Sequence, residues 1–238
     1  MKKLAAVIVA AGSSTRMGKS IPKQFIKINN IPVLAYSLMA FQNSYLVDEI
    51  FVVSQLSWFD KIIRIANKFG ISKLREVVPG GDLRQDSSLN GVIAAENFEY
   101  IAVHDAARPM IDLSDINKVI EGAFECGCSL LASKITDTVA YVDSNKFDIT
   151  EYGNRENLIA VHTPQVLKRT IILKSLSLAR DLKIVLTDDI SGAKMQGHRV
   201  KVVFSKNPNI KLTVPHDLKL ITMYFQQTLA NSIHTNLS

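Results

Sequence analysis

Four apolar segments along the chain are typical of buried β-strands. Each combines Val, Ile, Leu and Ala with few charged residues, as expected for a strand covered on both faces. They are Leu4–Ala10, Glu49–Ser54, Tyr100–Val103 and Ser129–Ile135. We expect these segments to be central strands of one sheet.

Helical patterns alternate with these strands. Apolar residues recur at spacings of three and four, which places them on one face of a helix. One set is Trp58, Ile62, Ile65 and Phe69; a second is Ile116, Ile120, Ala123 and Phe124; a third, in segment 215–233, is Leu218, Ile221, Phe225 and Leu229. Alternating strands and helices predict an α/β fold, a Rossmann-like three-layer sandwich with a mostly parallel sheet. With no linker, repeat or low-complexity stretch, residues 1–238 are expected to form a single domain.

Residues 138–154 interrupt this alternation. Val139, Tyr141 and Val142 lead into a polar turn at residues 143–146, and Phe147 and Ile149 follow. This pattern predicts an inserted β-hairpin. Its apolar residues favour contact with a partner subunit, with a solvated loop as the alternative.

Composition and charge narrow the class of protein. Of the 238 residues, 47% are hydrophobic and 21% charged, and the net charge is +6. No run of five basic residues occurs, so we predict no nucleic-acid partner. The first apolar run is too short to cross a bilayer and is broken by Gly12, so we predict no membrane association and a cytoplasmic location. Cys126 and Cys128 are interpreted as free thiols.

The loop after the first strand, residues 10–20, is the main candidate for a ligand site, because ligands bind beyond the carboxyl ends of strands in open α/β sheets. A dinucleotide-binding motif would need Gly where Ser14 stands. A phosphate-binding P-loop would need four residues between Gly12 and Gly18, where five stand, and Pro22 would interrupt its helix. The remaining interpretation is a nucleotidyltransferase loop with Arg16 and Lys23 directed at a triphosphate.

Further motifs extend this third interpretation along the chain. They are Ala10-Ala11-Gly12, Arg16-Met17, Pro22-Lys23-Gln24, Gly80-Gly81-Asp82, Arg84, Asp86-Ser87, His104-Asp105-Ala106-Ala107-Arg108-Pro109, Asp137-Thr138, Arg155, Thr163-Pro164-Gln165, Thr187-Asp188 and Asn209-Ile210-Lys211. Together and in this order they resemble the 2-C-methyl-D-erythritol 4-phosphate cytidylyltransferases of the non-mevalonate isoprenoid pathway. The resemblance covers residues 4–224.

The resemblance implies a set of site residues and partners. CTP would be bound by Ala10, Ala11, Gly12, Arg16 and Lys23, with Gly81, Asp82 and Ser87 at the cytosine and ribose. The polyol phosphate or a metal would be bound by Asp105, Arg108, Thr138, Arg155, Thr163, Thr187 and Lys211. It also implies a homodimer in which the hairpin carries Thr138 and Arg155 into the neighbouring subunit's site.

The chemistry expected of such a site needs cations rather than an activated nucleophile. The attacking phosphate oxygen is already an anion, so catalysis depends on aligning two anions and neutralising them. We assign Arg16 and Lys23 to the α-phosphate and leaving group, Arg155 to the incoming phosphate and Lys211 to the nucleophilic oxygen. Asp105 is a candidate ligand of Mg²⁺, the expected cofactor, or an acceptor for a polyol hydroxyl.

Several alternatives remain open at this stage. Asp82 and Asp86 would also suit a helix start, as would Asp188 with Asp189. Lys19 and Lys27 are interpreted as solvated surface. A ribitol 5-phosphate cytidylyltransferase would share the fold and chemistry, although Ala106 and Ala107 favour the methylerythritol substrate. A non-catalytic nucleotide-binding module is the alternative from another class.

Overall fold

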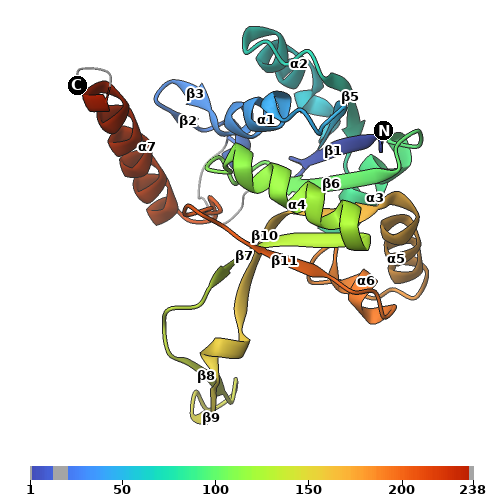
Figure 1. Cartoon of the computed structure of the whole chain (residues 1–238), viewed down its shortest axis with the longest axis vertical. Coiled ribbons are helices and arrows are strands. Elements are labelled where there is room, and N and C mark those ends of the chain that lie inside the picture. Colours follow the sequence, from blue (N-terminus) through green and yellow to red (C-terminus); the bar gives the residue numbers. More distant parts are fainter. Residues whose placement is uncertain (1, 13–20, 236–238) are drawn as a thin grey trace.

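A seven-stranded sheet forms the centre of the computed structural model, which describes residues 2–12 and 21–235 (Figure 1). The strand order is β11-β7-β10-β6-β1-β4-β5, and only β10 runs antiparallel to its neighbours. The strands are β1 (Leu4–Val9), β4 (Glu49–Ser54), β5 (Leu74–Pro79), β6 (Tyr100–Asp105), β7 (Cys128–Lys134), β10 (Ile159–Lys168) and β11 (Lys201–Phe204). The mostly parallel sheet predicted from the sequence is therefore confirmed.

Helices cover both faces of this sheet. They are α1 (Val33–Asn43), α2 (Phe59–Lys68), α3 (Arg84–Ala94), α4 (Leu113–Cys126), α5 (Arg169–Asp181), α6 (Ser191–Met195) and α7 (Pro215–Thr235). Alternate residues of β1 belong to different cores: Ala6 belongs to the core that includes residues of α1, α2 and α4, whereas Val7 belongs to the core that includes residues of α3, α5 and α6. The apolar run of β1 is continuous because both of its faces are buried, and the three-layer prediction is confirmed.

Local sequence signals set the start of α3 and both ends of α4. Leu83 is the N-cap of α3, and its N–H donates to the Asp86 carboxylate (3.0 Å). Asp112 caps α4 by accepting from Ser114 N (2.7 Å), and Gly127 ends that helix with φ 89°. Asp86 therefore acts as a helix cap, one of its two predicted alternatives.

The four predicted strands and three predicted helices are present, but shorter elements escape the pattern. The 3₁₀ turns η2 (Lys23–Phe25) and η3 (Leu56–Trp58) each hold three residues. Strands β2 (Lys27–Ile28) and β3 (Ile31–Pro32) form a small hairpin beside α1. Runs of two or three residues carry no measurable periodicity, so the sequence does not reveal them.

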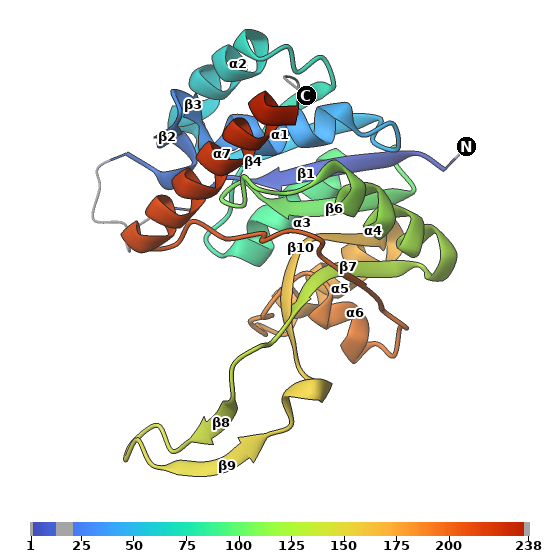
Figure 2. The ribbon, with the colours of Figure 1, turned by 60° about the vertical axis from the view of Figure 1, so that its left-hand side comes forward.

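A hairpin arm (residues 138–154) extends away from the helices and the sheet, as Figure 2 shows. Its strands, β8 (Val139–Val142) and β9 (Ile149–Gly153), pair antiparallel, and the turn η4 (Arg155–Asn157) follows them. The predicted hairpin is confirmed as an element. Large apolar side chains on the arm are exposed, with Phe147 at 82% and Tyr152 at 65%.

At the C-terminal end of the chain, α7 packs on the rest of the fold through Phe225, whose ring stacks on Tyr36 at a centroid distance of 4.5 Å. Within the part of the chain that the structure describes, neither α7 nor any other helix is long and apolar enough to cross a membrane.

Candidate active site

A cavity of about 820 Å³ lies at the carboxyl ends of β1, β4, β5 and β6. β1 is parallel to both of its neighbours, β4 and β6. After β1 the chain adds β4 and β5 on one side of this strand and then crosses over to add β6 on the other side. Such a switch point is where open α/β sheets bind ligands. The cavity is lined by residues 9–12, Lys23, Gln24, residues 54–57, residues 79–84, Ser87, Asp105, Ala106, Ala107 and Lys211.

The segment after β1 forms one wall of this cavity. Ala10 donates its N–H to Val53 O (2.7 Å), which continues the sheet for one residue beyond the strand. Gln24 is buried and donates its Nε2 to Ala10 O at 2.5 Å, so η2 is tied directly to this segment. The predicted nucleotide residues Ala10, Ala11 and Gly12 therefore share the cavity with Lys23.

Two glycines allow the opposite wall to come close. A Cβ on Gly80 would lie 2.5 Å from the Cβ of Ala11, and one on Gly81 would lie 2.4 Å from the Cβ of Asp86. Real side chains do not tolerate such contacts, so glycine is required at both positions. Gly81 N donates to Ser87 Oγ (3.1 Å), while the Asp82 side chain is exposed at the cavity.

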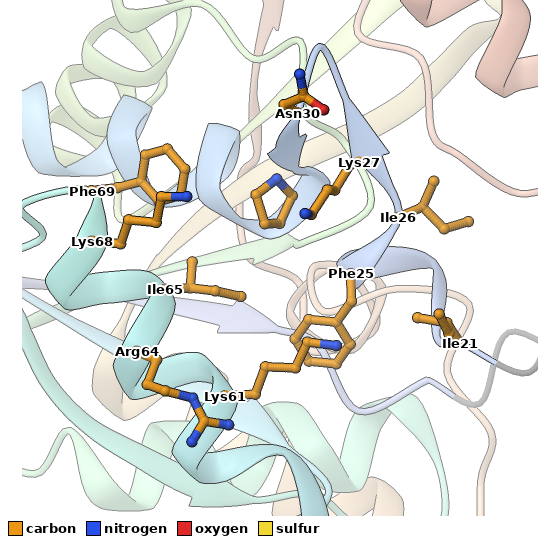
Figure 3. A pocket seen from close by; sticks show the side chains of 11 residues that line it. Ile21, Phe25, Ile26, Lys27, Asn30, Lys61, Arg64, Ile65, Lys68 and Phe69 are labelled. Atoms are coloured by element: carbon orange, nitrogen blue, oxygen red, sulfur yellow. The ribbon is translucent and has the colours of Figure 1, made fainter.

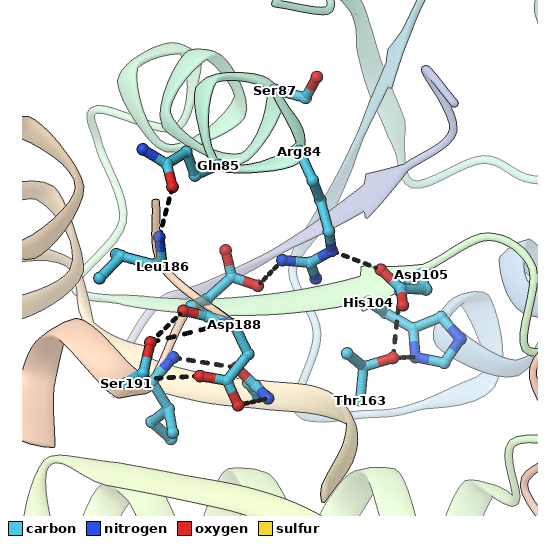
Figure 4. A network of polar contacts seen from close by, with 12 residues as sticks. Arg84, Gln85, Ser87, His104, Asp105, Thr163, Leu186, Asp188 and Ser191 are labelled. Carbon is cyan, nitrogen blue, oxygen red and sulfur yellow. Dashed lines mark hydrogen bonds and ion pairs between the residues drawn. The ribbon is translucent and has the colours of Figure 1, made fainter. Parts of the chain in front are cut away.

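Charged groups meet at the end of β6. Asp105 accepts from Arg84 Nε (3.0 Å) through one oxygen and from Lys211 Nζ (2.6 Å) through the other. The Arg84 Nη1 also pairs with Asp189 Oδ2 (2.8 Å), so one guanidinium joins two carboxylates (Figure 4). The Asp189 side chain is fully buried and that of Asp105 is 9% exposed.

These ion pairs determine the charge states of Asp105 and Arg84. Burial by itself would raise the pKa of Asp105, but the charges of Arg84 and Lys211 outweigh it and hold that pKa well below its usual range. Burial would lower the pKa of Arg84, and Asp189 and Asp105 instead raise it above its ordinary value. Asp105 is thus a carboxylate at neutral pH, held between two cations.

Behind Asp105 lies a hydrogen-bonded group centred on Thr163. Its Oγ1 accepts from Asp105 N (3.1 Å) and lies 3.1 Å from His104 Nδ1. His104 Nε2 lies 3.2 Å from Arg108 O, and a carbonyl can only accept, so Nε2 carries the proton and Nδ1 accepts from Thr163. Burial lowers the pKa of His104 to about 4, which keeps this ring neutral.

The same group reaches the loop that bears Lys211. Arg108 Nη1 donates to Asn209 O (2.6 Å), and Asn209 Nδ2 donates to Thr163 O (2.8 Å). Leu212 N donates to Ala107 O (2.8 Å) on the other side of Lys211. Lys211 therefore stands in a loop whose backbone is anchored on both sides, and its ammonium group is held by the pair with Asp105.

The predicted site residues fall into four groups. Nine line the cavity: Ala10, Ala11, Gly12, Lys23, Gly81, Asp82, Ser87, Asp105 and Lys211. Thr163 and Arg108 lie behind it, in the hydrogen-bonded group around His104. Thr187, Thr138 and Arg155 are exposed and do not line it; Thr138 and Arg155 belong to the arm or its base. Arg16 lies outside the described residues. The functional role assigned to each of these residues remains a prediction.

Two alternatives for acidic residues are resolved by geometry. Asp188 Oδ1 accepts from the N–H of Ser191 (2.7 Å), the first residue of α6, so Asp188 supports the start of this helix, whose N-cap is Ile190. The other carboxylate oxygen of Asp188 accepts from Gln165 Nε2 (2.9 Å). Asp189 instead faces Arg84 and belongs to the charged network.

Arg84 and Asp189 are the members of the site whose function the sequence did not reveal. Arg84 is part of a recognised motif, but nothing nearby in the sequence indicates its partners, which lie 21 and 105 positions away. One feature of the sequence could have indicated that Arg84 has acidic partners. Arg84 is the first residue of α3, where the helix dipole disfavours a cation, and such a position calls for compensating carboxylates.

Metal ligands are few in the described part of the chain, which holds no group of three or more His, Cys, Asp or Glu side chains able to enclose an ion. Asp105, the predicted magnesium ligand, already has both oxygens paired with cations. The described residues therefore do not by themselves form a binding site for Mg²⁺.

Comparison with known proteins gives one consistent result. Residues 4–227 match the family model described as IspD: 2-C-methyl-D-erythritol 4-phosphate cytidylyltransferase. Proteins of that description from Pelotomaculum thermopropionicum and Alkaliphilus metalliredigens are 36% and 38% identical, covering 92% and 91% of this chain and 92% and 90% of their own lengths. The crystal structure of 4-diphosphocytidyl-2C-methyl-D-erythritol synthase from Anaerococcus prevotii superposes with a TM-score of 0.84 at 26% identity, covering 94% of this chain and 96% of that one.

Proposed function

The chain belongs to the 2-C-methyl-D-erythritol 4-phosphate cytidylyltransferase family, and from this premise we propose how its residues carry out the reaction. The enzyme transfers CMP from CTP to 2-C-methyl-D-erythritol 4-phosphate, giving 4-diphosphocytidyl-2-C-methyl-D-erythritol and pyrophosphate. The observation that carries the proposal is that Lys23 and Lys211, 188 positions apart, line one cavity with the glycine-rich walls.

CTP occupies this cavity in the proposed arrangement. The cytosine and ribose lie against Gly81, Asp82 and Ser87, on a wall that Gly80 and Gly81 allow to pack closely against Ala11 and Asp86. The triphosphate lies along Ala10 to Gly12, beside the Lys23 ammonium group. Backbone N–H groups and a cation are the partners that phosphate groups require.

The chemical step is an in-line displacement at the α-phosphorus of CTP. A phosphate oxygen of the polyol phosphate forms the new P–O bond, the bond between the α-phosphorus and the bridging oxygen breaks, and pyrophosphate leaves with that electron pair. Lys23 and Arg16 neutralise charge on the α-phosphate and the leaving group. Lys211 holds the incoming oxygen, so its charge offsets the repulsion between the two anions.

Asp105 binds the polyol in this arrangement. Its pKa is held low by Arg84 and Lys211, so it remains a carboxylate and accepts a hydrogen bond from a substrate hydroxyl. Arg84, which also lines the cavity, pairs with this carboxylate and positions it. The pair with Lys211 also sets the distance between the hydroxyl site and the cation that holds the nucleophile.

Magnesium enters the proposal as part of the nucleotide substrate. The described residues do not by themselves form a binding site for the ion, so the proposed reaction uses no resident metal. Mg²⁺ commonly binds through phosphate oxygens with one or two protein carboxylates. A magnesium–CTP complex needs no further acidic cluster.

A second copy of the chain completes the site in our proposal. Thr138 and Arg155, predicted to contact the polyol phosphate, lie at the arm and not in the cavity of their own chain. The arm carries exposed Tyr141, Phe147 and Tyr152, an apolar set that favours burial against protein. A homodimer in which each arm reaches the other subunit would satisfy both features.

Substrate choice is the property to test first. Pyrophosphate release from magnesium–CTP is measured with 2-C-methyl-D-erythritol 4-phosphate and with ribitol 5-phosphate. We expect release with the first compound and little with the second.

Lys23→Gln and Lys211→Gln should each lower kcat by about a hundredfold, because each removes a cation from the transition state.

Lys118→Gln is the matched control, since Lys118 is an exposed lysine on α4 outside the cavity. It should behave as wild type. Faster release with ribitol 5-phosphate would overturn the substrate assignment while leaving the mechanism in place. Full activity in Lys23→Gln and Lys211→Gln would overturn the mechanism.

A further inference from the structure

A second cavity, of about 800 Å³, lies between α2 and the small β2–β3 hairpin. Its lining residues are Ile21, Phe25, Ile26, Lys27, Asn30, Pro32, Lys61, Arg64, Ile65, Lys68 and Phe69. None of them lines the active-site cavity. Its volume is in the range of cavities that enclose small organic molecules.

Every charged residue that lines this cavity is basic. Lys27, Lys61, Arg64 and Lys68 contribute four cations, and no carboxylate among the residues that the structure describes lines it. Among the described residues, none of these four side chains forms a salt bridge. The cavity thus gathers positive charge that the described part of the protein leaves uncompensated.

The floor of the cavity is apolar. Phe25 and Ile65 are 5% and 7% exposed, and Phe25 packs against Trp58 at a ring-centroid distance of 4.9 Å. Figure 3 shows Lys61 extending across the Phe25 ring, with its Nζ 4.4 Å from the ring centroid. The same Nζ is 4.8 Å from the Trp58 centroid. An aromatic face is only a weak partner for an ammonium group, so an anion would bind Lys61 more strongly.

Two short turns connect this cavity to the active site. In η2, Phe25 lines the second cavity while Lys23 and Gln24 line the first. In η3, Leu56 and Ser57 line the first cavity, and the next residue, Trp58, packs on Phe25. A ligand that changes the packing of Phe25 therefore acts on the turn that carries Lys23.

We propose that this cavity binds an organic anion with an apolar body, and that its occupation alters the affinity of the active site for CTP. The apolar body rests on Phe25, Ile65 and Phe69, and the carboxylate or phosphate group pairs with Lys61 and the neighbouring cations. Because coupling between two binding sites is reciprocal, CTP changes the affinity for this ligand by the same factor. The coupling rests on the proposed position of CTP; the binding site does not.

Trp58 provides a direct measurement, because it is the only tryptophan of the chain. Octyl phosphate serves as the probe, with inorganic phosphate and 1-octanol as controls that retain only the anion or only the apolar body. We expect saturable quenching or a shift of Trp58 emission by octyl phosphate, with at least about tenfold weaker binding of either control compound.

Matched variants locate the binding. The double variant Lys61→Gln/Lys68→Gln removes two cations from α2 and should weaken octyl phosphate binding at least about tenfold. Lys118→Gln/Lys219→Gln removes two exposed helical lysines elsewhere and should not. Equal binding by the two double variants, or inorganic phosphate binding as tightly as octyl phosphate, would overturn the site.

The coupling is measured separately, by repeating the titration with saturating magnesium–CTP. A shift in the dissociation constant for octyl phosphate in the wild type, absent from Lys61→Gln/Lys68→Gln, supports coupling. An unchanged constant, with CTP binding verified in the same sample by calorimetry, would overturn the coupling but leave the site. Absence of CTP binding in that sample would instead count against the proposed function.

Discussion

Arg84 shows how much depends on a single side chain. It joins Asp105, at the end of β6, to the fully buried Asp189, just before α6. Removing one partner of a buried ion pair leaves the other charge without compensation, which costs more than the pair itself contributes. The residue is therefore a test of whether the charged network stabilises the site.

Arg84→Gln should lower the free energy of unfolding by about 3 kcal/mol at neutral pH, because two largely buried carboxylates lose their partner. The pKa of Asp105 is depressed in the folded protein, so the stabilisation exists above the ordinary value of 3.8 and is lost as pH falls below it. The difference between variant and wild type should therefore shrink toward pH 3. Urea unfolding at several pH values measures both effects.

Arg75→Gln is the matched control, because Arg75 pairs with Glu49 at 3.8 Å on an exposed surface. It should change stability by less than about 1 kcal/mol. Arg84→Gln/Asp189→Asn should recover part of the loss, since it removes one of the unpaired charges. Wild-type stability of Arg84→Gln at pH 7 would contradict the role given to this network.

His104 predicts a second dependence on pH. Burial lowers its pKa to about 4, whereas the unfolded chain binds a proton near 6.5. The unfolded state thus holds more protons between these values, so stability rises with pH from about 4 to 6.5 and levels off above, by on the order of 3 kcal/mol.

His104→Gln should reduce the slope of unfolding free energy against pH in this window by up to about one proton. Chemical unfolding at half-unit pH intervals measures this slope. His216→Gln, on the exposed surface of α7, should leave the slope unchanged. An unchanged slope in His104→Gln would show that His104 titrates normally in the folded state.

At the scale of elements, the sequence predicts the helices and strands that have a clear pattern of apolar residues. It does not predict features that depend on pairing with residues far away in the chain. The β4 strand is bounded by the two residues that the apolar pattern indicated, Glu49 and Ser54, because a doubly covered strand must be apolar throughout. The antiparallel β10 follows no such rule. Apolar and polar residues do not alternate regularly along it, and its direction is set by pairing with β6 and β7.

The same distinction separates the site residues that the sequence predicts from those that it does not. Motifs on single loops, such as Ala10 to Gly12, can be recognised because their residues are consecutive. The pairing of Arg84 with Asp189 and the position of η2 between two cavities arise only when separate segments pack together. The sequence predicts that Lys27 lies on the solvated surface; it is exposed, but it also lines the second cavity, a role that the sequence alone does not indicate.

At the scale of the whole molecule, the proposed dimer predicts complementation between two defective subunits. Lys23→Gln removes a cation from the cavity, and Arg155→Gln removes one from the base of the arm. Each variant alone should be nearly inactive. In a mixed population, half of the dimers would be heterodimers with one intact site, so activity should return to about a quarter of the wild-type value.

The mixture is prepared by unfolding and refolding the two variants together, with pyrophosphate release as the measurement. Refolding each variant alone is the control. Mixing Lys23→Gln with Lys211→Gln, whose residues line the same cavity, should restore no activity. Equal recovery in both mixtures, or none in either, would contradict a site shared between subunits.

The position of the arm has a consequence for how the chain can change in length. Lys134 at the end of β7 pairs with Ile159 at the start of β10, so the arm closes a loop between neighbouring antiparallel strands. The entropy lost on closing such a loop grows only with the logarithm of its length, and about 24 residues cost little more than 12 would. Insertions and deletions in the arm therefore change its reach while the sheet keeps nearly all of its folding free energy.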